Sequence, residues 1–147
     1  MKKIILLITF IIPITISATG LPIVDLELYG GGESTEIKDG DSSKGAVIGG
    51  KLTAGIGLNY GVDLRHNFDR KSTTGAAVFG FGFPMVDIYG LAFKDLKNNN
   101  KKKSYGVGGG VSINLLLLNP YVEYRKDISD STIEEHMVSI GLSFNLF

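Results

Sequence analysis

The sequence predicts an all-β protein, an eight-stranded antiparallel up-and-down transmembrane β-barrel that follows a cleaved signal peptide. Three observations support this prediction. Apolar and polar side chains alternate with a period of two in eight segments, which is the pattern of half-buried strands. The connections between these segments are alternately long and short, as in membrane barrels. Glycine provides 20 of the 147 residues, which disfavours long helices.

The first eighteen residues have the layout of a secretory signal peptide. Two lysines follow Met1, and an apolar run then extends to Ile14 before a stretch of small and polar residues. This order is typical of cleaved signals. The apolar core of about eleven residues is too short to span a bilayer, which needs about twenty. We therefore expect residues 1–18 to be the signal peptide and residues 19–147 to form one domain, the barrel.

The composition excludes several classes of protein. No cysteine is present, which excludes a lipid-modified N-terminal cysteine, a disulfide framework and a thiolate metal site. The 15 basic and 15 acidic residues balance, so no excess of positive charge indicates a nucleic-acid partner. After the signal, no apolar stretch approaches the length of a transmembrane helix.

The clearest strand is predicted at residues 55–65. Five apolar side chains at the even positions from Ile56 to Leu64 alternate with small or polar residues at the odd positions. Eleven residues is also the length that a tilted strand needs to cross a membrane.

The same test predicts seven more strands, at residues 21–30, 45–53, 75–83, 86–94, 105–115, 119–126 and 136–147. The segment 86–94 is the least regular of them. There we assign Tyr89, Leu91 and Phe93 to the apolar face and Lys94 to the opposite face. Eight strands are an even number, as the closure of an antiparallel barrel requires.

The connections are predicted to differ between the two ends of the barrel. Four are long and polar, at residues 31–44, 66–74, 95–104 and 127–135, and three are short, at Ala54, Pro84–Met85 and residues 116–118. Long loops at one end and short turns at the other are typical of barrels inserted into a bacterial outer membrane from the periplasm. We therefore predict that location.

Alternation alone does not tell which face points into the barrel. A soluble lipocalin-like barrel would turn its apolar face inward. Here the apolar face carries no charge within the strands, although Asp87 lies near one turn. Lipid requires this, because a charge at the membrane midplane costs about 2–4 kcal/mol. The opposite face combines charges with glycine, which suits a narrow barrel interior. We therefore predict that lipid covers the apolar face.

The polar face carries four acidic and four basic side chains, which we predict to pair inside the barrel because unpaired buried charges are costly. They are Asp25, Glu27, Asp63, Glu123, Lys51, Arg65, Lys94 and Arg125. An interior filled in this way disfavours open, porin-like diffusion.

The whole pattern resembles the small eight-stranded outer-membrane proteins of the OmpX, OmpA-barrel and opacity-protein type. The most specific part is the C-terminal strand, residues 138–147, which resembles the aromatic signal read by the barrel-insertion machinery. The resemblance implies that Phe144 and Phe147 form this signal and that the machinery is a partner. Phe147 departs from the family pattern because it is out of phase with Phe144. Either the strand bulges at its end or Leu146 replaces the aromatic residue.

Both histidines lie where strands are predicted to meet long loops. Lipid A-modifying enzymes of similar size use histidine with serine or aspartate, so His136 with Ser139 and His66 with Asp69 and Ser72 are candidate nucleophile and base pairs. Residues three apart lie on opposite faces of a regular strand, however. We predict no catalytic residues, and such an enzyme remains an alternative.

Acidic residues cluster in the first predicted loop, at Glu33, Glu36, Asp39 and Asp41. Carboxylates bind hard cations, but the spacing with a distal bidentate glutamate is missing. We interpret the cluster as a solvated loop and predict no metal site and no cofactor.

One loop is predicted to be strongly basic, with Lys97, Lys101, Lys102 and Lys103 around a run of asparagines. Facing outward, these lysines would meet phosphates of lipopolysaccharide or another anionic polymer as point charges. The predicted function is a barrel with a closed polar interior that anchors four exposed loops for surface contact, in adhesion or envelope structure. Its expected partners are outer-membrane lipid and lipopolysaccharide, with no host or cell-surface ligand identified. An outer-leaflet lipid A-modifying enzyme, a narrow channel and a soluble secreted lipocalin-like barrel remain alternatives.

Overall fold

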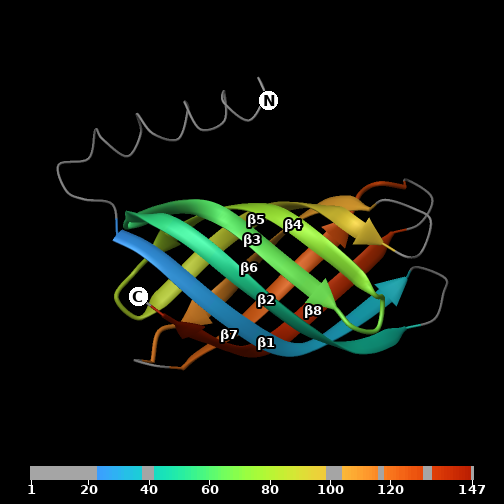
Figure 1. Cartoon of the computed structure of the whole chain (residues 1–147), viewed down its shortest axis with the longest axis horizontal. Coiled ribbons are helices and arrows are strands. Elements are labelled where there is room, and N and C mark those ends of the chain that lie inside the picture. Colours follow the sequence, from blue (N-terminus) through green and yellow to red (C-terminus); the bar gives the residue numbers. More distant parts are fainter. Residues whose placement is uncertain (1–22, 38–41, 99–103, 116–117, 131–133, 147) are drawn as a thin grey trace, which may run out of the picture.

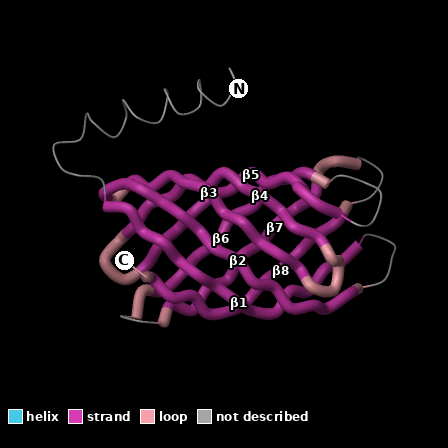
Figure 2. Tube along the Cα trace, in the orientation of Figure 1, coloured by secondary structure: helices cyan, strands magenta, loops and turns pink. Residues whose placement is uncertain are grey.

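The computed structural model describes residues 23–37, 42–98, 104–115, 118–130 and 134–146. These residues form the strands β1 (Ile23–Ile37), β2 (Ser43–Ile56), β3 (Leu58–Asn67), β4 (Ser72–Gly82), β5 (Val86–Asn98), β6 (Tyr105–Ile113), β7 (Asn119–Asp127) and β8 (Glu135–Asn145). Each strand pairs antiparallel with the next, and β8 pairs with β1 to close the barrel (Figure 1). Figure 2 shows strands along the whole barrel wall, with turns and loops at its two ends. The predicted fold class, an eight-stranded antiparallel up-and-down barrel, is confirmed, whereas the predicted signal peptide lies outside the described residues.

In the part of the chain that the structure describes, no helix has the length and apolar character needed to span a membrane.

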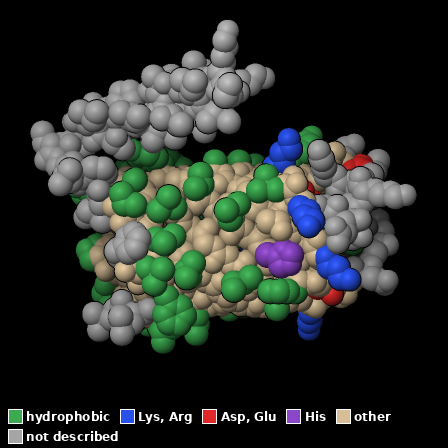
Figure 3. Space-filling view, viewed as in Figure 1, with side chains coloured by type: hydrophobic (Ala, Val, Ile, Leu, Met, Phe, Trp, Pro, Cys, Tyr) green, Lys and Arg blue, Asp and Glu red, His purple; other side chains and the backbone are tan. Residues whose placement is uncertain are grey.

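Side chains alternate between the outer wall and the interior along the strands. On β7, Tyr121, Glu123 and Arg125 are buried, whereas Val122 and Tyr124 between them are exposed on the wall. Figure 3 shows hydrophobic side chains spread over this outer surface. The prediction that the apolar face lies outside is confirmed, with one strand as an exception.

The exception is β5, where the assignment of the two faces is wrong. Tyr89, Leu91 and Phe93 are buried in the interior, and Lys94 is exposed on the outside. The aromatic rings occupy space left free by glycines of the neighbouring strand β6. A Cβ atom added at Gly110 would lie 2.5 Å from the Tyr89 ring. The packing of the β5 rings against the β6 glycines decides which face of β5 points inward, because the narrow interior accepts large side chains only beside small ones.

The first strand is longer than predicted. The prediction of a loop at residues 31–44 is wrong for most of that range, because β1 continues through three glycines to Ile37 and β2 begins at Ser43. The glycines serve close packing of strands. A Cβ atom at Gly31 would lie 2.7 Å from the Cα atom of Gly141 on β8. The other long connections are also shorter than predicted, because β3, β4, β5 and β8 extend into them.

The first short turn lies three residues later than predicted. Ala54 is paired with Tyr60 within the β2–β3 ladder, and Gly57 alone links the two strands. Gly57 has a φ of 73°, a left-handed conformation that glycine adopts without steric cost. The second turn lies at Pro84–Met85 as predicted, closed by a hydrogen bond from Phe83 N to Val86 O of 2.9 Å. Of the third turn, residues 116–117 lie outside the described residues.

The interior is filled according to a simple rule. The odd-numbered strands supply most of the large side chains, which are Tyr29, Asp63, Arg65, Tyr89, Phe93, Tyr121, Glu123 and Arg125. The even-numbered strands supply mainly small ones, among them Gly49, Ala76, Gly106, Gly110, Ser112, Ser139, Gly141 and Ser143. Alternation of large and small residues is how small barrels fill their interiors. As a result, long charged side chains from β1, β3 and β7 meet near the barrel axis.

Candidate functional site

Two arginines and three carboxylates form the centre of the interior. Arg125, only 1% exposed, places Nη2 2.8 Å from Asp63 Oδ2 and Nε 2.6 Å from Glu123 Oε1. Arg65 Nη1 lies 2.6 Å from the same Glu123 oxygen, and Nη2 of Arg65 pairs with Glu33. We call Glu33, Asp63, Arg65, Glu123 and Arg125 the central cluster. Its opposite charges alternate in one chain of ion pairs.

Neutral side chains supply further hydrogen bonds to the carboxylates of the cluster. Tyr29 OH donates to Asp63 Oδ1 at 2.7 Å, and Tyr89 OH donates to Glu123 Oε2 at 2.9 Å. Glu33 accepts hydrogen bonds from Ser139 Oγ at 3.0 Å and from Asn67 Nδ2 at 2.6 Å. Each carboxylate of the cluster therefore has a guanidinium and at least one neutral donor. Buried charges are stable only with such additional hydrogen bonds.

Small cavities lie on either side of the cluster. The cavity nearer the long loops, called the loop-end cavity, has a volume of about 20 Å³ and is lined by Arg65 and Arg125 among others. The cavity nearer the short turns, called the turn-end cavity, has a volume of about 50 Å³ and is lined by Tyr89 and Lys51 among others. A single water needs roughly 10–15 Å³ on this scale. The loop-end cavity therefore has room for about one water molecule and the turn-end cavity for about three to five, and the central cluster lies between the two cavities.

The turn-end cavity is acidic. Asp25, Glu27 and Asp87 line it together with one cation, Lys51. The Lys51 Nζ atom lies 3.0 Å from Glu27 Oε2 and 4.0 Å from the centre of the Tyr89 ring. The Asp87 carboxylate accepts a hydrogen bond through Oδ2 from Asn114 Nδ2 at 2.9 Å.

The eight charged residues predicted for the interior are distributed as follows. Asp63, Arg65, Glu123 and Arg125 belong to the central cluster, and Asp25, Glu27 and Lys51 line the turn-end cavity. The prediction for Lys94 is wrong: its side chain is exposed outside, because the two faces of β5 are reversed.

Sequence reasoning missed several interior residues. It placed Glu33 in a loop, although Glu33 continues the alternation of Glu27 and Tyr29 on β1, which was the available signal. At the loop end, Arg70 Nη2 lies 2.7 Å from Glu135 Oε1, and Ser104 donates a hydrogen bond to Asp127. The predicted loop boundaries excluded Glu33, Asp127 and Glu135 from the strands, whereas Arg70 and Ser104 do lie in connections.

The candidate catalytic pairs are not brought together. His136 Nδ1 lies 2.6 Å from Tyr124 OH, whereas Ser139 is fully buried inside with Arg65. His66 Nδ1 lies 3.0 Å from Thr73 Oγ1, while Ser72 is buried. Within the described ranges, no group of three or more His, Cys, Asp and Glu residues is placed to hold a metal ion.

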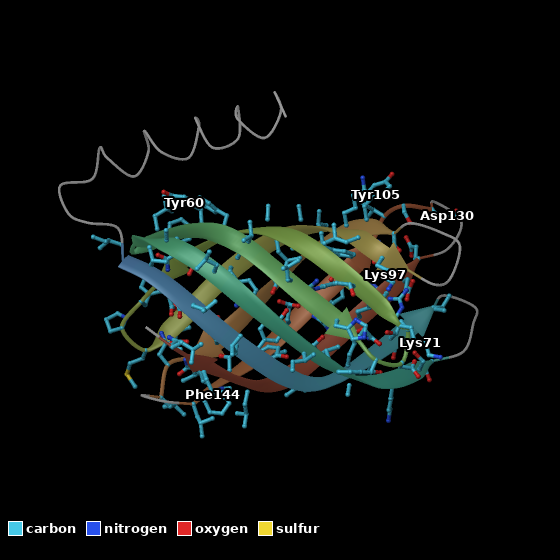
Figure 4. The ribbon with its side chains drawn as sticks, in the orientation of Figure 1. Tyr60, Lys71, Lys97, Tyr105, Asp130 and Phe144 are labelled. Atoms are coloured by element: carbon cyan, nitrogen blue, oxygen red, sulfur yellow. The ribbon has the colours of Figure 1, made fainter. Side chains whose placement is uncertain are left out.

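Basic side chains gather on the outside near the loop end. Lys44, Lys71, Lys94 and Lys97 are exposed there. Figure 3 shows Lys and Arg side chains at this end, and Figure 4 places Lys71 and Lys97 there with Tyr105. Phe144 is exposed at the opposite end (Figure 4). The predicted contact residues Lys101, Lys102 and Lys103, and Phe147 of the predicted insertion signal, lie outside the described residues.

Comparison with known proteins gives matches among solved structures alone. No protein-family model matches the chain, and no curated protein matches its sequence. The attachment invasion locus protein Ail of Yersinia pestis, crystallised with the heparin analogue sucrose octasulfate, superposes with a TM-score of 0.57 at 14% identity, over 84% of this chain and 99% of that chain.

Two further structures have lower scores. Neisserial surface protein A gives a TM-score of 0.47 at 17% identity, over 82% of this chain and 96% of that chain. The N-terminal β-barrel domain of Pseudomonas aeruginosa OprF gives 0.44 at 13% identity, over 82% and 97%. The likeness to Ail shows the fold alone, a small closed barrel of eight antiparallel strands.

Proposed function

We propose that this chain is an integral protein of the bacterial outer membrane, a non-enzymatic barrel with a closed interior whose loops make surface contacts. The observation that carries the proposal is the distribution of polar and apolar side chains, which is the reverse of that in a soluble protein. Large apolar side chains such as Ile48, Val62 and Phe79 are exposed on the wall, while paired charges are buried at the axis. A continuous apolar wall of this kind is suited to lipid and would promote aggregation in water.

Two alternatives have less support. A narrow channel needs a continuous water path, whereas the ion pairs of the central cluster stand between two small cavities of about 20 and 50 Å³. A lipid A-modifying enzyme needs an assembled nucleophile and base, whereas His136 and Ser139 lie on opposite faces of β8.

Residues 1–18 act in this proposal as the export signal, and the C-terminal strand with Phe144 and Phe147 is read by the insertion machinery. Support for the second point comes from the exposed position of Phe144 on the outer wall of β8, in line with Leu142 and Ile140.

Membrane fractionation combined with gel mobility tests the proposal. The protein is expected in the outer-membrane fraction, resistant to extraction with high salt or carbonate, and to migrate differently on gels before and after boiling. A closed barrel resists unfolding by detergent at room temperature because it has no open sheet edge. Release of folded protein without detergent would contradict the membrane location and favour the soluble barrel.

The basic residues near the loop end suggest the chemistry of the surface contact. Lys94 and Lys97 are exposed at the outer end of β5, and residues 101–103 add three more lysines to the same connection. Ail, which has the same fold, was crystallised with a sulfated heparin analogue. We include in the proposal that these lysines hold phosphate or sulfate groups of lipopolysaccharide or another anionic polymer.

Removing two of these charges is expected to weaken binding to such polymers. The double variant Lys94→Gln/Lys97→Gln should bind immobilised heparin, and vesicles containing phosphorylated lipid A, about three- to tenfold more weakly, because exposed ion pairs contribute about 0.2–1 kcal/mol each. The matched control Lys94→Arg/Lys97→Arg keeps both charges and should bind like the original protein. Equal binding by the glutamine variant would remove these two lysines from the proposed contact.

A further inference from the structure

The short-turn end of the barrel carries an apolar rim. Six large hydrophobic side chains at the three short connections are exposed, and Met85, at 64%, is the most exposed of them. We call this set the turn rim, and it consists of Ile56, Leu58, Phe83, Met85, Leu115 and Leu118. Turns that project into water are normally polar, because water then satisfies their backbone groups.

The exposed charges of the described residues lie toward the other end of the barrel. Among the described residues, the charged side chains most open to the surroundings are Glu36, Lys44, Asp69, Lys71, Lys94 and Lys97, all in the loop-end half of the barrel. The charged residues near the turns line the interior cavity instead, as Asp25 and Asp87 do. Figure 3 shows this separation, with blue and red side chains at one end and hydrophobic ones at the other.

The height of the apolar wall accounts for this rim. Lys94 on β5 and the rim residue Met85, which directly precedes that strand, are nine positions apart, which corresponds to about 23 Å along the barrel axis for a strand tilted by about 40°. Between Lys126 on β7 and the rim residue Leu118, the height is about 20 Å by the same geometry. The apolar band of outer-membrane barrels is about 25 Å tall. On these two strands the wall approaches this height only if the rim is counted as part of it.

Several backbone groups of the described part of the rim form hydrogen bonds within the protein. Gly82 N donates to Gly57 O at 2.7 Å, which joins the first turn to the second. Asn114 N donates to Met85 O at 2.9 Å, and Leu118 N donates to Leu115 O at 3.2 Å. Turns in contact with hydrocarbon need such internal bonds, because each unsatisfied group there costs several kcal/mol.

From these observations we infer that the turn rim is immersed in the acyl-chain region of the lipid leaflet that it faces. Its occupant is phospholipid, and the rim continues the apolar wall without a polar break. This inference rests on the proposed membrane location and adds to it a position: the barrel sits deep at its turn end and projects from the membrane only at its loop end.

Single tryptophans test the depth directly, because the natural chain contains none. Three variants are compared in phosphatidylcholine vesicles: Met85→Trp in the rim, Val122→Trp on the middle of the wall, and Lys71→Trp at the loop end. The lipids carry bromine, a contact quencher, either close to the headgroup or near the end of the acyl chain. The fluorescence of the Met85→Trp variant is expected to lose most of its intensity to shallow bromines and to resist aqueous iodide. The Lys71→Trp variant should respond in the opposite way.

The outcomes separate this inference from the membrane location. If Met85→Trp is quenched by iodide while Val122→Trp is quenched by brominated lipid, the barrel is in the membrane but its rim is in water, and the inference fails. If neither is quenched by brominated lipid, the membrane location itself fails. If Met85→Trp resists both quenchers while Val122→Trp responds to lipid, a protein contact covers the rim, which also overturns the inference.

Discussion

Replacing Arg125 with methionine is expected to lower the free energy of unfolding by about 3–5 kcal/mol, the usual cost of removing one partner from a buried ion pair. Arg125 forms the ion pair with Asp63 and shares Glu123 with Arg65. Methionine fills much of the same volume but leaves Asp63 charged and without this guanidinium. The side chains are buried, so water does not replace the lost interaction.

Urea titration of the protein in lipid vesicles, followed by gel mobility, measures this effect. Lys126→Met is the matched control, because Lys126 is the next residue on β7, faces outward and pairs with Glu134 at 3.3 Å in a partly exposed position. It should change the stability by less than about 1 kcal/mol. Adding Asp63→Asn to Arg125→Met should recover part of the loss, since the unpaired charge is then removed. Equal stability of the two single variants would show that the buried ion pairs of the central cluster do not stabilise the barrel.

Placing an arginine at position 122 is expected to cost about 2–4 kcal/mol, because Val122 faces outward in the middle of β7, where lipid is proposed to cover the wall. Val122 is already 51% exposed, so the arginine meets no steric obstacle in the barrel. In a barrel surrounded by water, the same substitution would change the stability by about 0.5 kcal/mol or less.

Ile128→Arg provides the matched control. Ile128 is exposed to a similar degree, 48%, but follows β7 at the loop end. A charge there should cost about 0–1 kcal/mol, as at the membrane interface. Folding yield in vesicles and urea titration measure both variants. A negligible effect of Val122→Arg would argue that water, not lipid, contacts the wall.

The sequence predicted the number of strands and the orientation of most of them, because charged and apolar residues fall on opposite faces. On β7, Glu123 and Arg125 alternate with Val122 and Tyr124, so only one orientation places the apolar face in lipid. On β5 both faces are largely apolar, and Lys94 was the charged residue on which the predicted orientation depended. The true orientation depends on where the glycines of β6 leave room, which is a property of the neighbouring strand.

Glycine occupies a turn in one place and the interior of a strand in another, and the local sequence does not distinguish the two roles. At Gly57 it marks a turn through its positive φ. At Gly31 it lies within a strand and allows β1 to approach Gly141 on β8. Because the segment around Gly31 was predicted to be a loop, Glu33 was not predicted to lie in the barrel interior. Such a choice depends on contacts between strands that are distant in sequence.

The partners within the central cluster also depend on distant contacts. Arg125 on β7 meets Asp63 on β3, across the barrel and 62 residues away in the chain. The alternation pattern places both side chains inside, but the stagger of the strands decides their heights along the axis. Composition therefore predicted paired charges, while the identity of each pair required the three-dimensional fold.

The pairing of β1 with β8 has a consequence for biosynthesis. Glu27 aligns with Asn145 and Ile37 with Glu135, so the first strand finds one of its two neighbours only in the eighth, which is synthesised after the other seven. Until then both outer strands present unpaired N–H and C=O groups that invite aggregation. The barrel therefore cannot close before β8 has been made, and a chain that lacks this eleven-residue strand has no means of joining its two edges.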